Sequence, residues 1–303
     1  MARDTVFALR GAGRRVDILV KKSFAAAADE TGADRVISYD PKNQSAVKLI
    51  RELNTERYDE VFDLHSNMRS RFIAALLKAK KKRRIKKHFW RRKLMVWLKY
   101  IPKGGYSVRD EYLKTCGLDP KEHPAAVSVK KIKRKKGSVR VLFHIGAKHR
   151  LKRWPHYAKL AELLSENPSV SVTITGIKDE VEKDDEILYI KKRNIRNMIG
   201  KTDQKGLLRE IERCDVFVGN DTMAAHAASL YGKKAFVFLG PTASGFGFIT
   251  KDRFDIIERD LTCRPCHLHG GEKCPIGDFR CLDAVSPEAV CGRIQKYIGK
   301  AGG

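Results

Sequence analysis

Three polar strand ends in the second half of the chain carry residues that could bind an anion. The first is HIGAKHRLKRWP (144–155), a loop rich in His, Lys and Arg that follows an apolar run. The second is TGIKDE (175–180), and the third is GNDTMAAH (219–226), which leads into an alanine-rich segment. Ligands of open α/β sheets bind outside the carboxyl ends of strands, and helix N-termini offer free N–H groups to anions. These three stretches therefore predict a nucleotide-diphosphate site.

Four side chains are the candidates for holding that diphosphate: Lys152, Asp221, Thr222 and His226. Lys152 supplies positive charge from the first loop, and Asp221 and Thr222 stand where the alanine-rich helix begins. His226 follows Thr222 by four residues and so shares a helix face with it. Each has a simpler explanation, because an Asp-Thr pair commonly caps a helix and a histidine among alanines usually packs. Their combination in one domain favours the binding site.

Four cysteines near the carboxyl end form a second cluster: Cys263, Cys266, Cys274 and Cys281, spaced C-x2-C-x7-C-x6-C. Four thiolates in a loop rich in proline and glycine could close a tetrahedral site for a structural zinc ion. Reduced, partly buried thiols are the alternative, and the spacing leaves both open. The isolated Cys116, Cys214 and Cys291 are expected to pack.

Strands and helices must position these groups, and their patterns alternate along the chain. β-Branched runs predict strands at 16–20, 35–38, 60–64, 139–145, 170–175, 215–219 and 234–240. Helical patterns lie near 24–31, 44–56, 68–79, 106–116, 155–166, 205–213, 222–231 and 286–298. This alternation is typical of parallel sheets built from βαβ units. The predicted fold class is α/β, with two Rossmann-like domains whose parallel sheets face a cleft.

A charged, proline-punctuated stretch at 118–137 has the composition of a domain boundary. We therefore predict one domain over 1–125 and a second over 138–303. Of the 303 residues, 42% are hydrophobic, which is normal for a globular protein. No apolar run approaches the ~18 residues that cross a bilayer, and the start lacks a secretory signal. We expect a cytoplasmic protein whose cysteines are reduced or hold a metal.

The net charge of +26 is unevenly distributed. Segment 78–93 holds eleven Lys and Arg and no acid, and segment 130–136 holds six more. Such density predicts an anionic partner, which could be nucleic acid, an anionic membrane face or a phosphorylated substrate. A solubilising surface is the simpler alternative. No known RNA-binding module is present, so no specific nucleic acid is expected.

The segment 88–101 combines basic and apolar residues at near-helical spacing. Its apolar members are Phe89, Trp90, Leu94, Trp97, Leu98 and Ile101. Such a stripe usually packs on the core of its own domain, which is the outcome we expect. The alternative is a basic amphipathic helix that contacts an anionic membrane with its tryptophans at headgroup depth.

Several motifs, taken in order, resemble those of glycosyltransferase family 9, the ADP-heptose:lipopolysaccharide heptosyltransferases. KRWP, GNDT…H, FLGPT and CRPCHLHGGEKCPIGDFRCLDAVSPEAV are similar to the donor domain of that family. YDEVFDLHSNMRS (58–70) and VDILVKKSFA (16–25) are similar to its acceptor domain. The resemblance implies a GT-B fold and inverting transfer of heptose from ADP-heptose to the lipopolysaccharide inner core. It further implies a location at the cytoplasmic face of the inner membrane and no cofactor for transfer.

The resemblance also assigns roles by position. Lys152 would neutralise the leaving diphosphate, and Asp221, Thr222 and His226 would hold the sugar diphosphate. The implied acceptor-binding residues are His65, Asn67 and Arg69. Acceptors of this kind carry Kdo, heptose and phosphates, which suit the basic first domain.

Two departures from the family pattern matter for catalysis. Met223 and Ala224 stand where family members have Gly-Pro, so Met223 could crowd the pocket. The family begins with an apolar strand ending in Gly-Asp, whose Asp is the catalytic base, and by register that Asp is expected upstream of Met1. Asp4 is too close to the next strand to replace it and is expected to be exposed near a frayed terminus.

Three functions therefore remain open: a heptosyltransferase, an impaired relative that binds a nucleotide sugar or an anionic acceptor, and a basic nucleic-acid-binding protein. If the base lies within the chain, Asp17, Asp63 and His65 are the next candidates.

Overall fold

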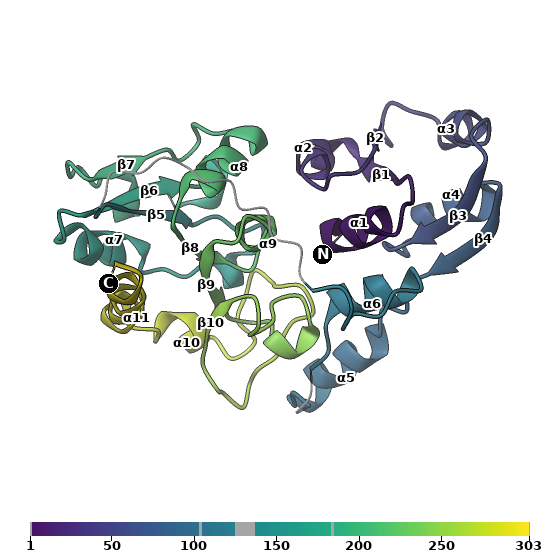
Figure 1. Cartoon of the computed structure of the whole chain (residues 1–303). Helices are drawn as coiled ribbons and strands as arrows, with labels where there is room; N and C mark the ends of the chain where they lie inside the picture. Colours follow the sequence, from purple (N-terminus) through teal and green to yellow (C-terminus); the bar gives the residue numbers. More distant parts are fainter. Residues whose placement is uncertain (1, 103–104, 125–136, 183–184, 303) are drawn as a thin grey trace. The chain divides into compact units, whose positions relative to one another are not determined.

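The chain folds into two compact α/β units (Figure 1). The computed structural model describes residues 2–102, 105–124, 137–182 and 185–302. Unit 1 comprises Met1–Phe89 and Tyr106–Ala126, and unit 2 comprises Trp90–Gly105 and Val127–Gly303. The basic segment 130–136, and with it much of the predicted domain boundary, lies outside the described residues.

Unit 2 is built on a six-stranded parallel sheet in the order β10-β9-β8-β5-β6-β7. Its strands are β5 (Val139–His144), β6 (Val170–Thr175), β7 (Ile195–Asn197), β8 (Val216–Asn220), β9 (Lys234–Leu239) and β10 (Asp255–Glu258). Its helices are α5 (Phe89–Leu98), α7 (Tyr157–Ser165), α8 (Gln204–Arg213), α9 (Met223–Leu230), α10 (Arg280–Asp283) and α11 (Pro287–Gly302). Unit 2 also contains four short 3₁₀ turns among its described residues: η2 (Arg150–Lys152), η3 (Lys178–Glu180), η4 (Glu186–Leu188) and η5 (Ser244–Phe246). A further 3₁₀ turn, η1 (Lys22–Phe24), lies in unit 1.

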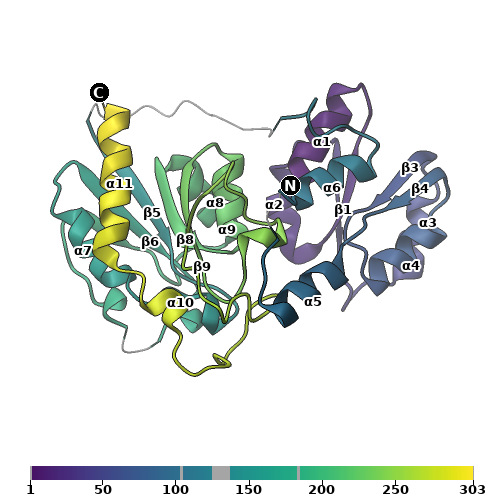
Figure 2. The same ribbon diagram turned by 90° about the horizontal axis from the view of Figure 1, so that it is seen from below.

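Helices cover both faces of this sheet, and the alternation of apolar residues along β5 shows why. Val141 and Phe143 join one buried cluster with α7 and α11, whereas Leu142 joins a second cluster with α8 and α9. Figure 2 shows α7 and α11 on one side of the sheet and α8 and α9 on the other. A strand buried on both faces must be apolar throughout, which is the pattern the sequence shows. The predicted parallel sheet is confirmed for this unit.

Unit 1 contains two separate two-stranded parallel sheets. One pairs β1 (Asp17–Lys21) with β2 (Arg35–Tyr39), and the other pairs β3 (Tyr58–Asp63) with β4 (Ala79–Arg84). The remaining helices are α1 (Ala2–Gly11), α2 (Ala25–Asp29), α3 (Ala46–Leu53), α4 (Met68–Leu76) and α6 (Val108–Thr115).

Side chains connect the two sheets of unit 1. The Tyr58 hydroxyl donates to Asp17 over 2.9 Å, and Arg14 pairs with Glu60 at 3.2 Å. No backbone ladder joins β1 to β3 within the part of unit 1 that the structure describes. Each of these strands therefore has one paired edge.

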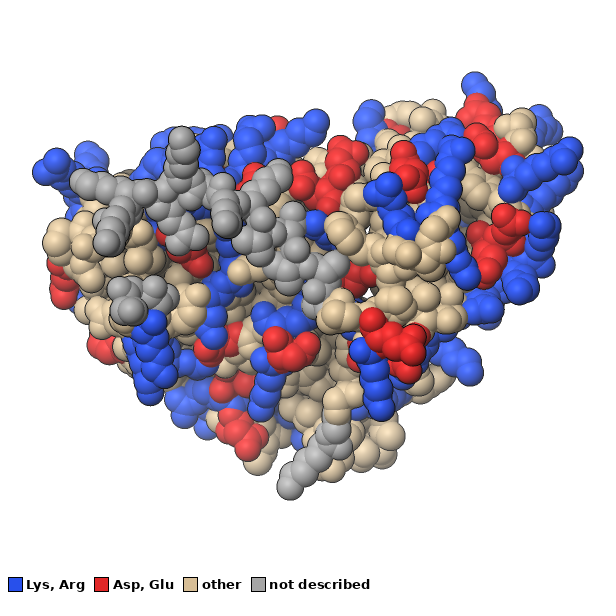
Figure 3. Space-filling view, in the orientation of Figure 1, with Lys and Arg blue, Asp and Glu red and all other residues tan. Residues whose placement is uncertain are grey.

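The strand β4 was not predicted, because its sequence AKKKRR is nearly all charge. The helix expected over 68–79 ends at Leu76, and the chain then pairs in parallel with β3. Charged residues, lysine above all, are common on edge strands, where they discourage pairing with other chains. Figure 3 shows Lys and Arg side chains gathered over the end of unit 1 that carries β3 and β4.

Asp4 is buried, so the expectation that it is exposed near a frayed terminus was wrong. It lies in α1, where its side chain is 0% exposed and its carboxylate is 3.7 Å from the Arg109 guanidinium of α6. Val6 and Leu9 of the same helix are also buried. The helix α1 is thus a packed element of unit 1.

The helix α5 presents the opposite face from the one expected. Arg92 and Met95 are its buried residues, whereas Trp90 and Trp97 are about three-quarters exposed, at 74% and 76%. The expectation that the apolar stripe packs on its own domain was therefore wrong for these residues.

Candidate functional site

The carboxyl ends of three central strands of unit 2 lie side by side. His144 at the end of β5 is in register with Thr175 on β6 and with Gly219 on β8. The next residue of β8, Asn220, is in register with Phe238 on β9. The loops predicted to bind an anion therefore leave the sheet at one edge, as the sequence indicated.

Asn220 ties these loops together from a fully buried position, with 0% exposure. Its Oδ1 accepts hydrogen bonds from the backbone N–H of Trp154 at 3.2 Å and from the Tyr157 hydroxyl at 3.0 Å. Its Nδ2 donates to the carbonyl of Ile145 at 2.8 Å. One amide thus fixes both ends of the loop after β5 to the end of β8.

This arrangement brings Lys152 onto Asp221. Lys152 ends the 3₁₀ turn η2, and its Nζ lies 2.6 Å from Asp221 Oδ2, with the two side chains 14% and 16% exposed. The Thr242 hydroxyl also faces Asp221 Oδ2, at 3.4 Å. Gly270 backs the lysine with φ +106°, and a Cβ there would lie 3.0 Å from Lys152 Cδ. The pair is therefore held from several sides.

The helix α9 begins beside this pair with an unsatisfied hydroxyl. Thr222 is the N-cap residue, but its side chain makes no capping hydrogen bond. Thr222 Oγ1 is shielded from solvent and has no hydrogen-bond partner among the described residues. The simpler explanation of the Asp-Thr pair as a side-chain cap is not what the structure shows. A shielded hydroxyl at a helix N-terminus is suited to a bound ligand oxygen.

His226 lies one turn further along α9 and is half-buried. Its ring meets Phe254 edge-on, with 5.9 Å between ring centroids. Burial lowers the pKa of His226 to about 4, against the opposing effect of the Asp221 carboxylate. The imidazole is therefore neutral at pH 7 and can donate or accept a hydrogen bond. Met223, one residue after the cap, packs against the apolar cluster under α8 and α9.

His144 is a second neutral histidine at the same strand ends. Its Nδ1 is 3.2 Å from the Thr175 hydroxyl, which in turn donates to the carbonyl of Phe143 at 2.9 Å. Because that hydroxyl proton is engaged, the oxygen accepts from Nδ1–H of the imidazole. Burial lowers the pKa of His144 to about 4. His144 therefore adds no positive charge to the loop. Among the described residues, Lys152 is the cation that pairs with Asp221.

Arg264 is a buried residue of the site that the sequence did not reveal. It is 4% exposed, and its guanidinium donates to the carbonyl of Thr242 at 2.8 Å and to Glu258 at 3.1 Å. It also donates to the carbonyls of Gly240 and Arg259. These bonds fix the loop after β9 and hence Thr242 beside Asp221. One buried arginine cannot be told from sequence among 62 Lys and Arg residues.

The four clustered cysteines line one pocket of about 160 Å³, together with Lys99 and Arg264. No group of three or more His, Cys, Asp or Glu among the described residues is placed to hold a metal ion, so the predicted structural zinc is not supported. Burial keeps thiols protonated: it raises the pKa of Cys266, and that of Cys281 to about 11. Burial also acts to raise the pKa of Cys274, but backbone N–H groups of residues 276–279 outweigh it and lower that pKa.

The predicted acceptor residues lie on the turn between β3 and α4 of unit 1: His65, Asn67 and Arg69. Asn67 caps α4, since its Oδ1 accepts from the N–H of Ser70 at 2.8 Å and its own N–H donates to the Ser70 hydroxyl. His65 and Arg69 are exposed. The three predicted acceptor residues thus lie on one turn, but the Asn67 amide oxygen is already bonded to the backbone of α4.

Two carboxylates of unit 1 were named as substitutes for the catalytic base. Asp63 stands at the carboxyl end of β3, is 6% exposed and has an Oδ2 without a hydrogen-bond partner in the described structure. Its Oδ1 accepts from the N–H groups of His65 and Ser66. Asp17 starts β1 and is bonded to Tyr58. Strand ends at the carboxyl edge are the usual place for chemistry, which favours Asp63 over Asp17.

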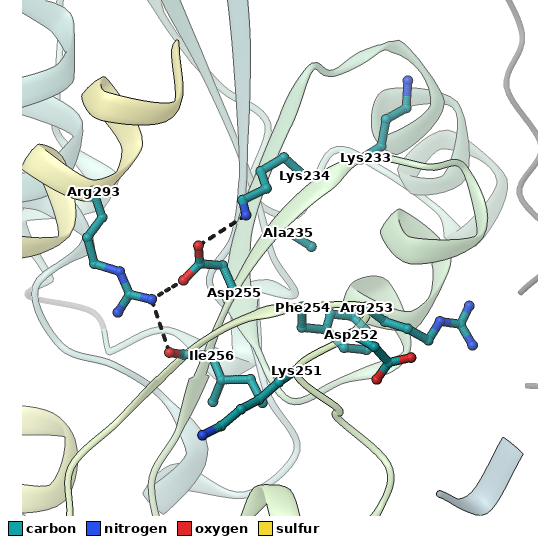
Figure 4. A pocket seen from close by; sticks show the side chains of 10 residues that line it. All are labelled: Lys233, Lys234, Ala235, Lys251, Asp252, Arg253, Phe254, Asp255, Ile256 and Arg293. Atoms are coloured by element: carbon teal, nitrogen blue, oxygen red, sulfur yellow. Dashed lines mark hydrogen bonds and ion pairs between the residues drawn. The ribbon is translucent and has the colours of Figure 1, made fainter. Parts of the chain in front are cut away.

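A larger cavity of about 450 Å³ lies at the amino ends of β9 and β10, the opposite edge of the sheet (Figure 4). It is lined by several cations, but Asp255 neutralises two of them, Lys234 at 3.1 Å and Arg293. Figure 4 shows Lys233 and Arg253 pointing away from one another. Cations that are paired or divergent do not form a single anion site, so this cavity is not the site that the sequence predicts.

Both units have parallel strands and flanking helices, the architecture of GT-B glycosyltransferases. The structure of E. coli ADP-heptose lps heptosyltransferase II matches with a TM-score of 0.73 at 15% identity, covering 99% of this chain and 95% of that one. E. coli heptosyltransferase WaaC with ADP matches with a TM-score of 0.68 at 17% identity, covering 97% and 94%. At such identity the likeness establishes the fold, and the predicted GT-B fold is confirmed.

Residues 46–272, most of the chain, match glycosyltransferase family 9 (heptosyltransferase). The chain belongs to this family, as its motifs predicted. Lipooligosaccharide heptosyltransferase 2 of Campylobacter jejuni is 31% identical over 151 residues, which is 48% of this chain and 46% of that protein. The matching part thus spans about half the length of this curated relative. Within the described residues, no helix is both long and apolar enough to cross a membrane.

Proposed function

We propose that this protein is an inverting glycosyltransferase that transfers heptose from ADP-heptose to the lipopolysaccharide inner core at the cytoplasmic face of the inner membrane. The observation that carries the proposal is the Lys152–Asp221 pair, 2.6 Å apart, beside the shielded and unpartnered Thr222 Oγ1 at the start of α9. The fold, the family and the E. coli relative solved with ADP support it.

In this proposal the leaving diphosphate is stabilised by charge that is already in place. Lys152 turns from Asp221 toward the phosphate oxygens, while the first N–H groups of α9 and the Thr222 hydroxyl donate to them. Once Lys152 has turned away, the Asp221 carboxylate accepts hydrogen bonds from hydroxyl groups of the sugar. Neutral His226 donates a hydrogen bond from the next turn. Groups fixed before the reaction stabilise the developing negative charge without further reorganisation.

The acceptor hydroxyl must lose its proton as it attacks the anomeric carbon. Among the described carboxylates at the carboxyl ends of unit 1 strands, we propose Asp63 as the base, because its Oδ2 is unengaged. His65 and Arg69 on the following turn would bind acceptor phosphates.

Calorimetry with ADP tests the donor site. Lys152→Ala should weaken binding by about 1.5–3 kcal/mol, the contribution of a charge-assisted hydrogen bond. Lys148→Ala is the matched control, since Lys148 is an exposed lysine of the same loop and its loss should leave affinity unchanged. Equal affinity for the Lys152 variant and the unmodified chain would remove Lys152 from the site.

Release of ADP from ADP-heptose, with and without a Kdo-containing acceptor, tests transfer itself. We propose that transfer needs no metal ion, so chelation should not change the rate. Binding of ADP without any turnover would support the second candidate, an impaired relative that binds a nucleotide sugar or an anionic acceptor. Failure to bind ADP, together with selective binding of one RNA, would support a nucleic-acid-binding protein instead.

A further inference from the structure

The exposed face of α5 is apolar, which is unusual for a helix on a protein surface. Trp90 and Trp97 are 74% and 76% exposed, and Leu94 and Leu98 are each 51% exposed. Their spacing of three, four and seven residues places them on one face of the helix. Surface helices normally turn such a stripe toward the core.

Polar groups attach this helix to unit 2. Arg91 donates to the carbonyl of Gly245 at 3.1 Å, and the Arg92 guanidinium lies 5.3 Å from the centre of the Phe248 ring. Met95 packs against Gly245 in η5, where an added Cβ would come within 2.9 Å of Met95 Cε. The cationic side of α5 thus faces the protein and the tryptophans face outward.

The end of the helix fixes this orientation. Lys99 adopts a left-handed backbone conformation with φ +52°, which ends α5 after Leu98. Ile101, the last member of the predicted stripe, is thereby turned toward the body, and a Cβ on Gly245 would lie 2.5 Å from its Cγ2. Lys99 Nζ also reaches the carbonyl of Pro265 at 3.4 Å.

The chain segment that contains this helix carries charge of one sign. No Asp or Glu occurs between Asp63 and Asp110, and Lys86 and Lys87 lie just before the helix. On the exposed face itself, Lys93 Nζ lies 5.0 Å from the centre of the Trp90 ring. A lysine whose stem follows an aromatic ring while its charge stays at the surface is typical of side chains at a membrane interface.

We propose that α5 docks on an anionic lipid bilayer. Trp90 and Trp97 lie at headgroup depth, Leu94 and Leu98 reach the acyl boundary, and the lysines meet the lipid phosphates. A second copy of this chain fits less well, because it would bring together two copies of a segment that has many Lys and Arg residues and no acid. Nucleic acid would pair with the basic residues but would not bury the exposed Leu94 and Leu98 side chains. Docking through α5 would place the enzyme at the membrane that carries its proposed acceptor. It rests on the proposed function only in that respect.

Vesicle binding by the full chain tests this helix directly. Vesicles of phosphatidylglycerol and phosphatidylethanolamine should retain the protein in a flotation assay, and phosphatidylcholine vesicles should not. Trp90→Ala combined with Trp97→Ala should lower the partition coefficient about tenfold or more, since two large apolar side chains leave the interface. Tyr189→Ala is the control, because it removes an aromatic residue that is 67% exposed elsewhere on unit 2.

Fluorescence gives a second readout that does not depend on substitutions. The chain has three tryptophans, and Trp154 is 2% exposed and stacked on Phe238. Lipids brominated on their acyl chains should therefore quench Trp90 and Trp97 and leave the Trp154 emission. Absence of quenching while the protein floats with vesicles would show that another surface binds.

Three results would overturn the proposal. The first is vesicle binding by the double variant that equals that of the unmodified chain. The second is vesicle binding that high salt abolishes and to which the two tryptophans contribute nothing. The third is an unmodified chain that forms a dimer and does not bind vesicles, with a double variant that is monomeric. ADP calorimetry on the same variants separates this test from the donor site. A double variant that no longer binds vesicles but still binds ADP supports α5 docking. An unmodified chain that does not bind ADP counts against the proposed function alone.

Discussion

Replacing Asn220 by alanine should strongly destabilise unit 2, because this amide has three hydrogen bonds and no solvent exposure. The substitution leaves the Trp154 N–H, the Tyr157 hydroxyl and the Ile145 carbonyl without their partner. A buried polar group that loses its partner costs about 1–3 kcal/mol. Water can reach none of the three easily, so we expect a total loss of about 3–5 kcal/mol. That is a large part of the stability of an ordinary domain.

Tyr157→Phe provides the matched comparison. It removes the hydroxyl but leaves Asn220 Oδ1 bonded to the Trp154 N–H, so its cost should be about 1 kcal/mol. Combining it with Asn220→Ala removes a group that the alanine variant leaves unsatisfied. The double variant should therefore lose less stability than the sum of the two single variants, by about 1 kcal/mol.

Urea unfolding followed by circular dichroism measures these differences. A loss below about 1 kcal/mol for Asn220→Ala would refute the assignment of Asn220 as the residue that ties the loop after β5 to β8. Strict additivity in the double variant would show that the Tyr157 hydroxyl finds another partner. Either result would also weaken the inference that the position of Lys152 depends on this amide.

Three further predictions concern protonation, thiol reactivity and the first unit. Burial lowers the pKa of His144 to about 4, below the ordinary 6.5, so the unfolded chain binds the extra proton between these values. The stabilisation is complete above about pH 6.5 and is lost as the pH falls toward 4, and His144→Asn should flatten that slope in urea unfolding at pH 7, 5.5 and 4.5. Cys274, with its lowered pKa, should be alkylated by iodoacetamide before Cys281, whose pKa is about 11, as peptide mass spectrometry would show. An added N-terminal strand should raise the melting temperature in a thermal melt, because β1 and β3 each have one unpaired edge among the described strands. No gain in melting temperature would contradict the assignment of the open edges of β1 and β3.

The sheet of unit 2 could be predicted from sequence because its central strands are apolar on both faces. The runs that form β5, β6, β8 and β9 begin and end within two residues of their predicted bounds. The strands β7 and β10 are three and four residues long and lie at the edges of the sheet, where no continuous apolar run marks them. The strand β4 has a charged sequence and was not predicted; only its first residue, Ala79, fell within the helix predicted over 68–79.

The candidate site could be predicted to the level of which strand ends carry it. Lys152 and Asp221 are 69 positions apart, and the rule that parallel strands end at one edge was enough to bring them together. The supporting residues could not be found in this way. Arg264 contacts backbone carbonyls, and such contacts leave no pattern in the sequence. The cysteine spacing suggested a metal, but spacing does not determine whether four thiols converge on one point.

The face that a helix buries is the part of the structure that periodicity predicts least well, and α5 and α9 show why. In α9, which lies between β8 and β9 in the chain, all four alanines are buried, so its packing did not depend on the direction of an apolar stripe. In α5 the stripe was identified correctly, yet the protein covers the side that carries Arg92 and Met95. An apolar stripe defines a direction on the helix, and what lies in that direction depends on the rest of the fold or on a partner. A helix whose apolar face is left outward by its own domain therefore indicates a surface with a second occupant, and the one-sign charge between Asp63 and Asp110 indicates an anionic one.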